Sequence, residues 1–311
     1  MFASRYLEDG VAAGHGAVLR VGLIGHGAIG SSVADALRRG VVPGAVLGGV
    51  LTRGHTAATA APAATAAPAA PTAPATPAAP AAPSAPARVR DLRELLASAD
   101  VVVEAAGQRA LREHGPAVLA AGRDLLAVSV GALADEALFR ELTRPAAARS
   151  GRLLICPGAL GGLDAVRAAA LAGPPATVRL TSTKAPASLV QPWMDGATAD
   201  RLRSLRPGDE PVTVFDGDAR EAATRFPRNA NVAATLALAA GDRADVRVRL
   251  VAAPDARLTR HVVEFAGPLG EYRFELANLP DPANPATSAL VAPAVLRSLA
   301  DLVPGVAWLV A

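Results

Sequence analysis

A glycine-rich turn near the start of the chain has the residues and spacing of a dinucleotide-binding site. Residues 21–24 are apolar and lead into Gly25-His26-Gly27-Ala28-Ile29-Gly30, and a helix-like stretch follows at residues 31–37. In such a turn Gly25 allows the tight bend, Gly27 lets the backbone approach a pyrophosphate, and Gly30 lets the helix pack closely on the strand. The amides of Ala28 and Ile29 would face the phosphates at the positive end of the helix dipole. The pattern predicts a nucleotide cofactor, with a structural glycine turn as the alternative.

The residues after the expected second strand bear on the choice of cofactor. NAD-selective sites usually carry Asp or Glu there for the ribose hydroxyls, whereas Thr52 and Arg53 follow Leu51 in this chain. Arg53 can pair with a 2′-phosphate, and the missing acid removes a repulsion. We therefore expect acceptance of NADP as well as NAD. The alternative is a solvated Arg53 at the root of the next segment.

Alternating strand-like and helix-like segments must position this turn. Strands are expected at residues 46–51, 101–106, 124–129 and 152–156, and helices at residues 91–99, 109–121 and 134–142. Repeated β-α units imply a parallel sheet whose ligands bind beyond the carboxyl ends of the strands. We expect a Rossmann-type domain over residues 1–158.

The pattern changes after Gly158. Strand-like stretches with period-two alternation occur at residues 177–182, 245–251, 261–265 and 271–276, and helices are expected from Gly161 to about Ala172 and at residues 231–241. They predict a second α/β domain over residues 159–284, with a mostly antiparallel sheet covered on one face. The last segment, residues 285–311, contains a helix expected at 288–302 that returns to the nucleotide domain.

Residues 56–88 form a low-complexity tract of almost only Ala, Pro and Thr. Prolines recur every third residue from Pro68 to Pro86, which is the period of a polyproline II helix. Without bulky apolar side chains the tract cannot form a core. We expect a disordered surface insertion, with a ligand for a proline-recognition domain as the alternative.

The composition excludes several classes of protein. The net charge of +3 is small for 311 residues and no basic block occurs, so nucleic acid binding is unsupported. No stretch predicts a membrane span, and the acidic N-terminal segment lacks the apolar core of a signal peptide. A single cysteine, Cys156, rules out an internal disulfide. We expect a cytoplasmic protein.

Several sequence blocks occur in the order and spacing of the L-aspartate dehydrogenases, which this chain resembles over residues 18–302 apart from the tract. Besides the glycine turn and His261 they are Pro157-Gly158-Ala159-Leu160-Gly161-Gly162-Leu163-Asp164, Lys184-Ala185-Pro186, Phe226-Pro227-Arg228-Asn229-Ala230-Asn231-Val232-Ala233-Ala234-Thr235 and Asn284-Pro285-Ala286-Thr287-Ser288. The resemblance implies a catalytic and dimerisation role for the second domain and a homodimer. It also implies NAD(P)-linked interconversion of L-aspartate with iminoaspartate or oxaloacetate plus ammonia, which can feed NAD biosynthesis.

The resemblance implies roles for individual residues. His261 matches the catalytic histidine, and an imidazole suits proton transfer in both directions. A dicarboxylate needs cations and hydroxyl donors, for which Lys184, Arg228, Thr287 and Ser288 are the candidates. The alternatives are a structural histidine, surface charges, and hydroxyls that cap the last helix.

Two asparagines complete the predicted site. An amide offers both a donor and an acceptor, so Asn229 and Asn231 are candidates to orient the nicotinamide or the substrate. The resemblance favours Asn231 and the backbone at Ala159 on the nicotinamide side, with a helix cap as the alternative for Asn231.

Other chemistries have weaker support. The remaining histidines have no carboxylate or cysteine at metal-ligand spacing, so we expect no metal site, and Cys156 is expected to be a buried strand residue. Alternative functions are another dehydrogenase or reductase, such as one acting on dihydrodipicolinate or homoserine, a catalytically silent NADP-binding sensor, or an interaction module built on the tract.

Overall fold

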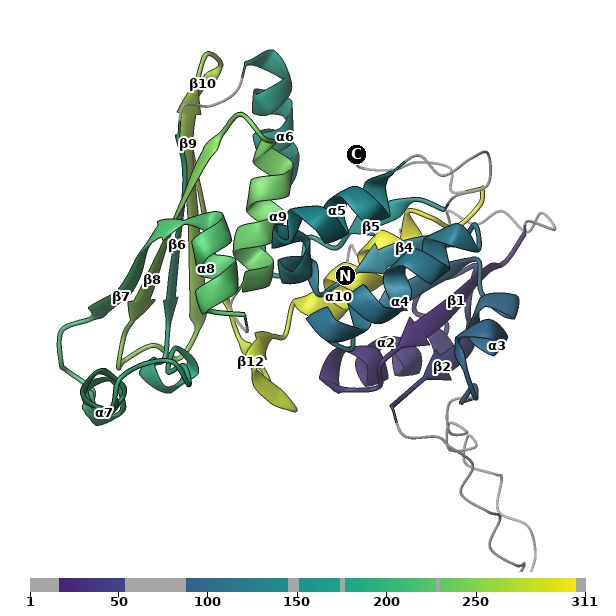
Figure 1. Ribbon diagram of the computed structural model, residues 1–311, viewed down its shortest axis with the longest axis horizontal. Helices are drawn as coiled ribbons and strands as arrows, with labels where there is room; N and C mark the ends of the chain where they lie inside the picture. Colours follow the sequence, from purple (N-terminus) through teal and green to yellow (C-terminus); the bar gives the residue numbers. More distant parts are fainter. Residues whose placement is uncertain (1–16, 54–87, 145–150, 174–176, 228–229, 306–311) are drawn as a thin grey trace, which may run out of the picture.

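We describe residues 17–53, 88–144, 151–173, 177–227 and 230–305 of a computed structural model. They form two units, each built on a five-stranded sheet (Figure 1). The chain completes the first sheet before it begins the second.

The first sheet is parallel throughout, in the order β2-β1-β3-β4-β5. Val101, Val102 and Val103 are all buried, as expected for a central strand covered on both faces. The predicted Rossmann-type parallel sheet is confirmed. Its strands are β1 (Leu19–Ile24), β2 (Ala45–Leu51), β3 (Val101–Glu104), β4 (Asp124–Ala127) and β5 (Leu153–Ile155).

Helices cover both faces of this sheet. On one face α2 (Ala28–Arg38) and α10 (Val291–Ala300) pack over β1, and Val33, Val295 and Leu299 share a core with its side chains. The other face carries α3 (Leu92–Ala97), α4 (Gln108–Ala120), the 3₁₀ helix η1 (Val130–Ala134) and α5 (Glu136–Thr143).

The second sheet has the order β10-β9-β6-β8-β7. Only β6 and β8 run parallel, and the other three pairs are antiparallel, so the mostly antiparallel sheet is confirmed. The strands are β6 (Thr177–Lys184), β7 (Val212–Asp218), β8 (Asp245–Ala252), β9 (Thr259–Gly267) and β10 (Gly270–Asn278).

Three helices cover the inner face of the second sheet, which is the face toward the first unit (Figure 1). They are α6 (Leu163–Ala172), α8 (Ala219–Arg225) and α9 (Ala230–Ala240). Strand alternation turns Val178, Leu180, Ser182 and Lys184 of β6 to this face, and all four are buried. The sequence pattern did not predict β7, α8, η1, the 3₁₀ helix η2 (Pro186–Ser188) or α7 (Gly196–Ser204).

A short ribbon leads back to the first unit. It consists of β11 (Pro280–Asp281) and β12 (Asn284–Ser288). The prediction of a helix from Ser288 was wrong at its start, because Ser288 ends β12 and α10 begins at Val291.

The Ala/Pro tract lies outside the described residues except for its last residue. Arg88 forms an isolated bridge with Val50, and the amide of Val89 donates to the carbonyl of Val50 at 3.1 Å. Arg88, the last residue of the predicted tract, therefore pairs with the first sheet.

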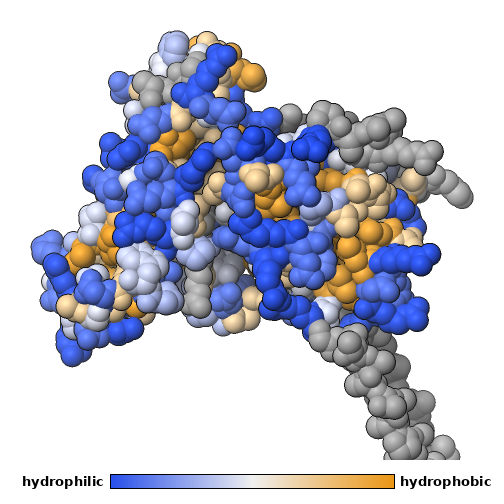
Figure 2. Space-filling view, in the orientation of Figure 1, coloured by the Kyte–Doolittle hydropathy of each residue, from blue (hydrophilic) through white to orange (hydrophobic). Residues whose placement is uncertain are grey.

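The surface is mixed in character. On the face drawn in Figure 2, hydrophilic residues dominate the second unit and broader apolar areas lie over the first. In the described part of the chain, no helix has the length and apolar character that crossing a bilayer requires.

Candidate active site

The glycine turn has the geometry of a phosphate cradle. Gly25 has a φ of +101°, and a Cβ on it would lie 2.8 Å from the carbonyl oxygen of Ala105. A Cβ on Gly30 would lie 2.2 Å from the carbonyl oxygen of Gly25, whereas one on Gly27 would meet no atom within 4 Å. Two of the glycines are thus required by close packing, while Gly27 borders open space at the N-terminus of α2. This arrangement fits the pyrophosphate of a dinucleotide.

Two pockets include residues of the turn. The turn pocket contains Gly25, His26 and Gly27, and the His261 pocket contains Ile29 of the same turn. Nε2 of His26 is buried without a hydrogen-bond partner among the described residues, as expected beside a site for a polar ligand. A dinucleotide crossing the turn would therefore extend from one pocket into the other.

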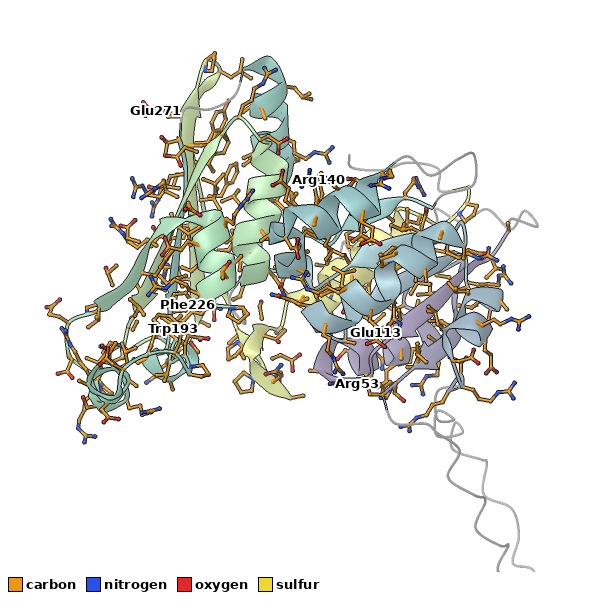
Figure 3. The ribbon with its side chains drawn as sticks, viewed as in Figure 1. Arg53, Glu113, Arg140, Trp193, Phe226 and Glu271 are labelled. Atoms are coloured by element: carbon orange, nitrogen blue, oxygen red, sulfur yellow. The ribbon has the colours of Figure 1, made fainter. Side chains whose placement is uncertain are left out.

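The turn pocket is rich in arginine. Arg53 from the end of β2, Arg88 and Arg109 of α4 all line it, together with Glu113. Figure 3 shows Arg53 at the edge of the first unit, where β2 ends. Of these three arginines only Arg53 was predicted, because Arg88 and Arg109 are remote from the glycine turn in sequence.

The His261 pocket draws its walls from both units. Its residues come from the glycine turn, from η1 and the end of β4, from the segment after β5, from the inner face of the second sheet, from α9 and from β12. They are Ile29, Val128, Val130, Cys156, Pro157, Gly158, Ala159, Lys184, Asn231, Val232, Thr235, Thr259, His261, Ala286, Thr287, Ser288 and Val291.

His261 is buried on the inner face of β9, with 1% of its surface exposed. Its Nδ1 lies 2.8 Å from Oγ of Ser182, which is its register partner on β6. Burial and the neighbouring charge of Lys184 lower the pKa of His261 to about 3. The imidazole is therefore neutral near pH 7 and carries one unprotonated ring nitrogen. Ser182 was not predicted; its signal in the sequence is a hydroxyl at an apolar position of an alternating strand.

Lys184 lies two residues beyond Ser182 on the same face of β6 and is 8% exposed. The alternative of a surface charge was therefore wrong. Burial lowers the pKa of Lys184 to about 8, so the ammonium is still largely charged near neutral pH. A buried cation in a pocket is a strong attractant for a carboxylate.

Asn231 joins the two units at the pocket wall. Its Oδ1 accepts a hydrogen bond from the amide of Gly131 in η1 at 2.9 Å, which orients the side chain and leaves Nδ2 to donate to a ligand. Nearby, Nδ2 of Asn278 donates to the carbonyl of Ala159 at 3.1 Å. Asn278 was not predicted.

Comparison with known proteins agrees with this geometry. Residues 164–302 match the model "Aspartate dehydrogenase, C-terminal", and residues 25–156 match "Homoserine dehydrogenase, NAD binding domain". L-aspartate dehydrogenase 2 of Bordetella pertussis is 43% identical over 202 residues, which cover 64% of this chain and 73% of the relative. The chain belongs to the L-aspartate dehydrogenase family.

Other relatives extend the comparison. The L-aspartate dehydrogenase of Ruegeria pomeroyi is 42% identical over 64% of this chain and 70% of its own length. The crystal structure of aspartate dehydrogenase from Thermotoga maritima shares the fold, with a TM-score of 0.63 at 22% identity, and covers 91% of this chain and 96% of that one. Members of this family are oxidoreductases that act on CH–NH2 donors with a pyridine nucleotide, which confirms the predicted class of enzyme.

The remaining predicted residues of this aspartate dehydrogenase family member fall into three groups. Thr287 and Ser288 line the His261 pocket, where Thr287 Oγ1 accepts from Asn284 Nδ2 at 3.1 Å and Ser288 Oγ accepts from the amide of Leu290 at 3.2 Å. Ala28 begins α2. Arg228 and Asn229 lie outside the described residues.

The segment before Arg228 is firmly anchored. Phe226 is fully buried and packs edge-on against Trp193, with ring centroids 5.5 Å apart (Figure 3). Nε2 of Gln108 in α4 donates to the carbonyl of Pro227 at 3.3 Å, which ties this segment to the first unit.

Two other buried groups frame the site. Glu104 at the end of β3 accepts hydrogen bonds from the amides of Ala106, Gly107 and Ser129 and from Ser129 Oγ, and burial raises its pKa. It joins the β3–α4 turn to the end of β4. Burial also raises the pKa of Cys156 to about 11, which disfavours its thiolate. Among the described residues, no three His, Cys, Asp or Glu side chains gather as a metal site would require.

Proposed function

We propose that this protein is an NAD(P)-dependent L-aspartate dehydrogenase. The observation that carries the proposal is the pairing of a buried, neutral imidazole with a buried cation in one pocket beside the glycine turn. Oxidation of an amino acid needs a base, and a dicarboxylate needs a positive charge; His261 and Lys184 supply these two groups.

The overall reaction converts L-aspartate, NAD(P)⁺ and water into oxaloacetate, ammonium, NAD(P)H and a proton, through iminoaspartate. The cofactor, when bound, supplies the hydride acceptor. Gly25, Gly27, Gly30 and the first amides of α2 would hold its pyrophosphate, and Asn231 with the carbonyl of Ala159 would hold the nicotinamide side. The remaining steps belong to residues of the His261 pocket.

Lys184 binds a substrate carboxylate, and Thr287 and Ser288 are hydroxyl partners at the β12 side of the pocket. Arg228 and Asn229 are further proposed ligands, on the strength of the family motif. A bound carboxylate also offsets the positive charge that lowers the pKa of His261. Substrate binding therefore makes the imidazole a stronger base.

His261 moves protons at its free ring nitrogen. It removes a proton from the substrate ammonium, so that the amine lone pair can form the C=N bond as hydride leaves Cα. After hydride transfer the ring releases this proton to solvent. The neutral ring then accepts a proton from water as the water oxygen bonds to the imine carbon, and it passes that proton to the substrate nitrogen. The C–N bond breaks as the new hydroxyl loses its proton and becomes the carbonyl, and ammonia takes up this proton to leave as ammonium. Since the imidazole begins neutral, each cycle can start without prior loss of a proton.

The proposal also covers the choice between NAD and NADP, the oligomeric state, and the cellular location and metabolic role of the enzyme. Arg53, with Arg88 and Arg109 in the same pocket, favours acceptance of a 2′-phosphate, so we expect use of NADP as well as NAD. Among the described residues, no helix covers the outer face of the second sheet (Figure 1), and we infer that this face is the contact of a homodimer. We further propose a cytoplasmic enzyme whose iminoaspartate feeds NAD biosynthesis.

Steady-state absorbance at the reduced nicotinamide band tests the proposal. Purified protein is assayed with L-aspartate, and in reverse with oxaloacetate plus ammonia, against both cofactors and a panel of other amino and 2-oxo acids. We expect the highest kcat/KM with the aspartate pair. Absent turnover with aspartate beside good turnover with another acid would contradict it.

A further inference from the structure

We infer that Ser182 is a positioning residue that accepts a hydrogen bond from Nδ1–H of His261 and so leaves Nε2 as the base of the reaction. The inference rests on the proposed function for the role of His261. The Oγ to Nδ1 distance is 2.8 Å, and both side chains are almost fully buried. Ser182 does not line the His261 pocket, so it acts through the imidazole and not by contact with substrate or cofactor.

The strand register makes this contact specific. His261 and Ser182 belong to a row of register partners that crosses the inner face of the second sheet. From β10 to β7 the row consists of Leu276, His261, Ser182, Leu250 and Phe215. Every member of this row is apolar except the histidine and the serine, which are adjacent and hydrogen-bonded. Packing alone would favour an apolar residue at position 182, and Ser182 instead supplies the one polar neighbour that His261 has within the row.

The charge in the pocket favours one direction of the hydrogen bond. A neutral imidazole has one N–H and one lone pair, so the nitrogen that faces Ser182 determines what the other nitrogen can do. Lys184 lines the same pocket as His261. An N–H dipole on the pocket side would point its positive end toward a cation, whereas a lone pair there is stabilised by it. The favoured tautomer therefore carries its proton on Nδ1, toward Ser182.

Substitution of Ser182 tests whether its hydroxyl positions His261 or whether the residue only fills space in the core. Ser182→Ala removes the hydroxyl and should lower kcat by about tenfold or more, with KM for aspartate and affinity for the nucleotide nearly unchanged. Ser182→Thr keeps the hydroxyl and should recover most of the lost turnover. Thr181→Ala is the matched control, because it removes a hydroxyl from the adjacent residue on the opposite face of β6 and should leave kcat unaltered.

A measurement on the ligand-free protein tests the inference without turnover. Long-range ¹H–¹⁵N correlation spectra of ¹⁵N-histidine-labelled protein distinguish the two tautomers, and His261→Gln identifies the signal of His261. We expect an Nδ1-protonated ring in the wild type and in Thr181→Ala, and a shift toward the Nε2-protonated ring in Ser182→Ala.

An Nε2-protonated wild-type ring, or a Ser182→Ala variant that is folded by circular dichroism and keeps both its tautomer and its kcat, would overturn the inference. The wild-type spectrum decides the matter even if Ser182→Ala fails to fold. Because the spectrum requires no substrate, a protein inactive on aspartate but Nδ1-protonated would count against the proposed function and still support the hydrogen-bond assignment.

Discussion

Burial shifts the pKa values of the two basic side chains of the His261 pocket in the same direction. His261 and Lys184 both have lowered pKa values, because burial disfavours their charged forms and the lysine charge further disfavours protonation of the histidine. At neutral pH this gives one neutral base and one cation. In the proposed mechanism the first group transfers protons and the second binds a carboxylate.

We expect His261→Ala to lower turnover by about 100-fold or more, because the general base is lost, with nucleotide affinity nearly intact. Steady-state kinetics measure the loss, and fluorescence titration with NADP is the control for folding. Wild-type turnover in a folded variant would mean that the histidine has only a structural part.

The pKa of Lys184 predicts how anion binding depends on pH. The side chain of Lys184 is positively charged below about pH 8 and loses this charge above it. The affinity for a non-reacting dicarboxylate such as succinate should therefore fall as pH rises through 8. The decline should approach about tenfold per pH unit.

Variants at this position provide the controls. Lys184→Arg keeps its charge to higher pH and should bind succinate without that decline, while Lys184→Met should bind weakly at every pH. Competitive inhibition constants from pH 6 to 9.5 provide the measurement. A wild-type profile parallel to that of Lys184→Met would remove Lys184 from the substrate site.

The position of Arg53 in the turn pocket predicts that this residue affects KM for NADP and not KM for NAD. Arg53→Ala should raise KM for NADP by about tenfold or more and leave NAD little affected, because only NADP carries the phosphate. Arg93 on α3 does not line the turn pocket, so Arg93→Ala is the matched control. An equal rise in KM for both cofactors in Arg53→Ala, or a strong preference of the wild type for NAD, would mean that Arg53 does not recognise the 2′-phosphate.

At the scale of elements, the predictable parts are those with strong periodicity. The strands of the first sheet were found because both of their faces are buried and their sequences are apolar runs, as in Val101–Val103. β7 was missed because its sequence, Val212–Asp218, contains two aspartates and a glycine on an edge strand. α8 was missed because its buried residues, Ala219, Ala222 and Ala223, are all alanines and give no strong apolar periodicity.

The site residues that were not predicted are those whose partners lie far away in the sequence. The family blocks led to His261, Lys184 and Asn231, but Ser182, Glu104 and Asn278 act through tertiary contacts. Ser182 is 79 residues from His261 and Asn278 is 119 residues from Ala159. No local pattern links such pairs. The register of β6 and β9 brings Ser182 to His261, whereas Asn278 reaches Ala159 across the contact between β10 and the segment after β5.

The flanks of the Ala/Pro tract predict that it can be removed. Arg53 and Arg88 line the same pocket, and Arg88 pairs with Val50, so the chain leaves and rejoins β2 at one place. Deleting residues 57–87 and closing the gap with a short glycine-containing loop should leave Tm and turnover nearly unchanged. Thermal unfolding of both forms checks this, and a drop in Tm of more than a few degrees would mean that the tract packs on the body.

At the scale of the whole molecule, the site exists only where the two units meet. Hydrogen bonds from Gly131 to Asn231 and from Gln108 to Pro227 join them, and α10 returns from the second unit to the core of the first. The spacing of the two units therefore determines the width of the His261 pocket.

Substitution of Asn231 separates its two roles. Asn231→Ala loses the bond to Gly131 and should lower the free energy of unfolding by about 1 kcal/mol while raising KM for the cofactor. Asn231→Asp keeps the acceptor oxygen but not Nδ2, so it should retain the stability and still raise KM. Denaturant unfolding and steady-state kinetics provide the two measurements. Unchanged KM in both variants would confine Asn231 to joining the units.

The pairing of β9 with β6 also makes turnover a reporter of correct folding. Successive side chains of a strand point to opposite faces, so a slip of one residue would carry His261 to the outer face and turn Val262 or Arg260 inward. Such a chain would retain its strand content and have no base in the pocket. The specific activity of refolded protein therefore counts the molecules that reached the native register, a quantity that far-ultraviolet circular dichroism does not resolve.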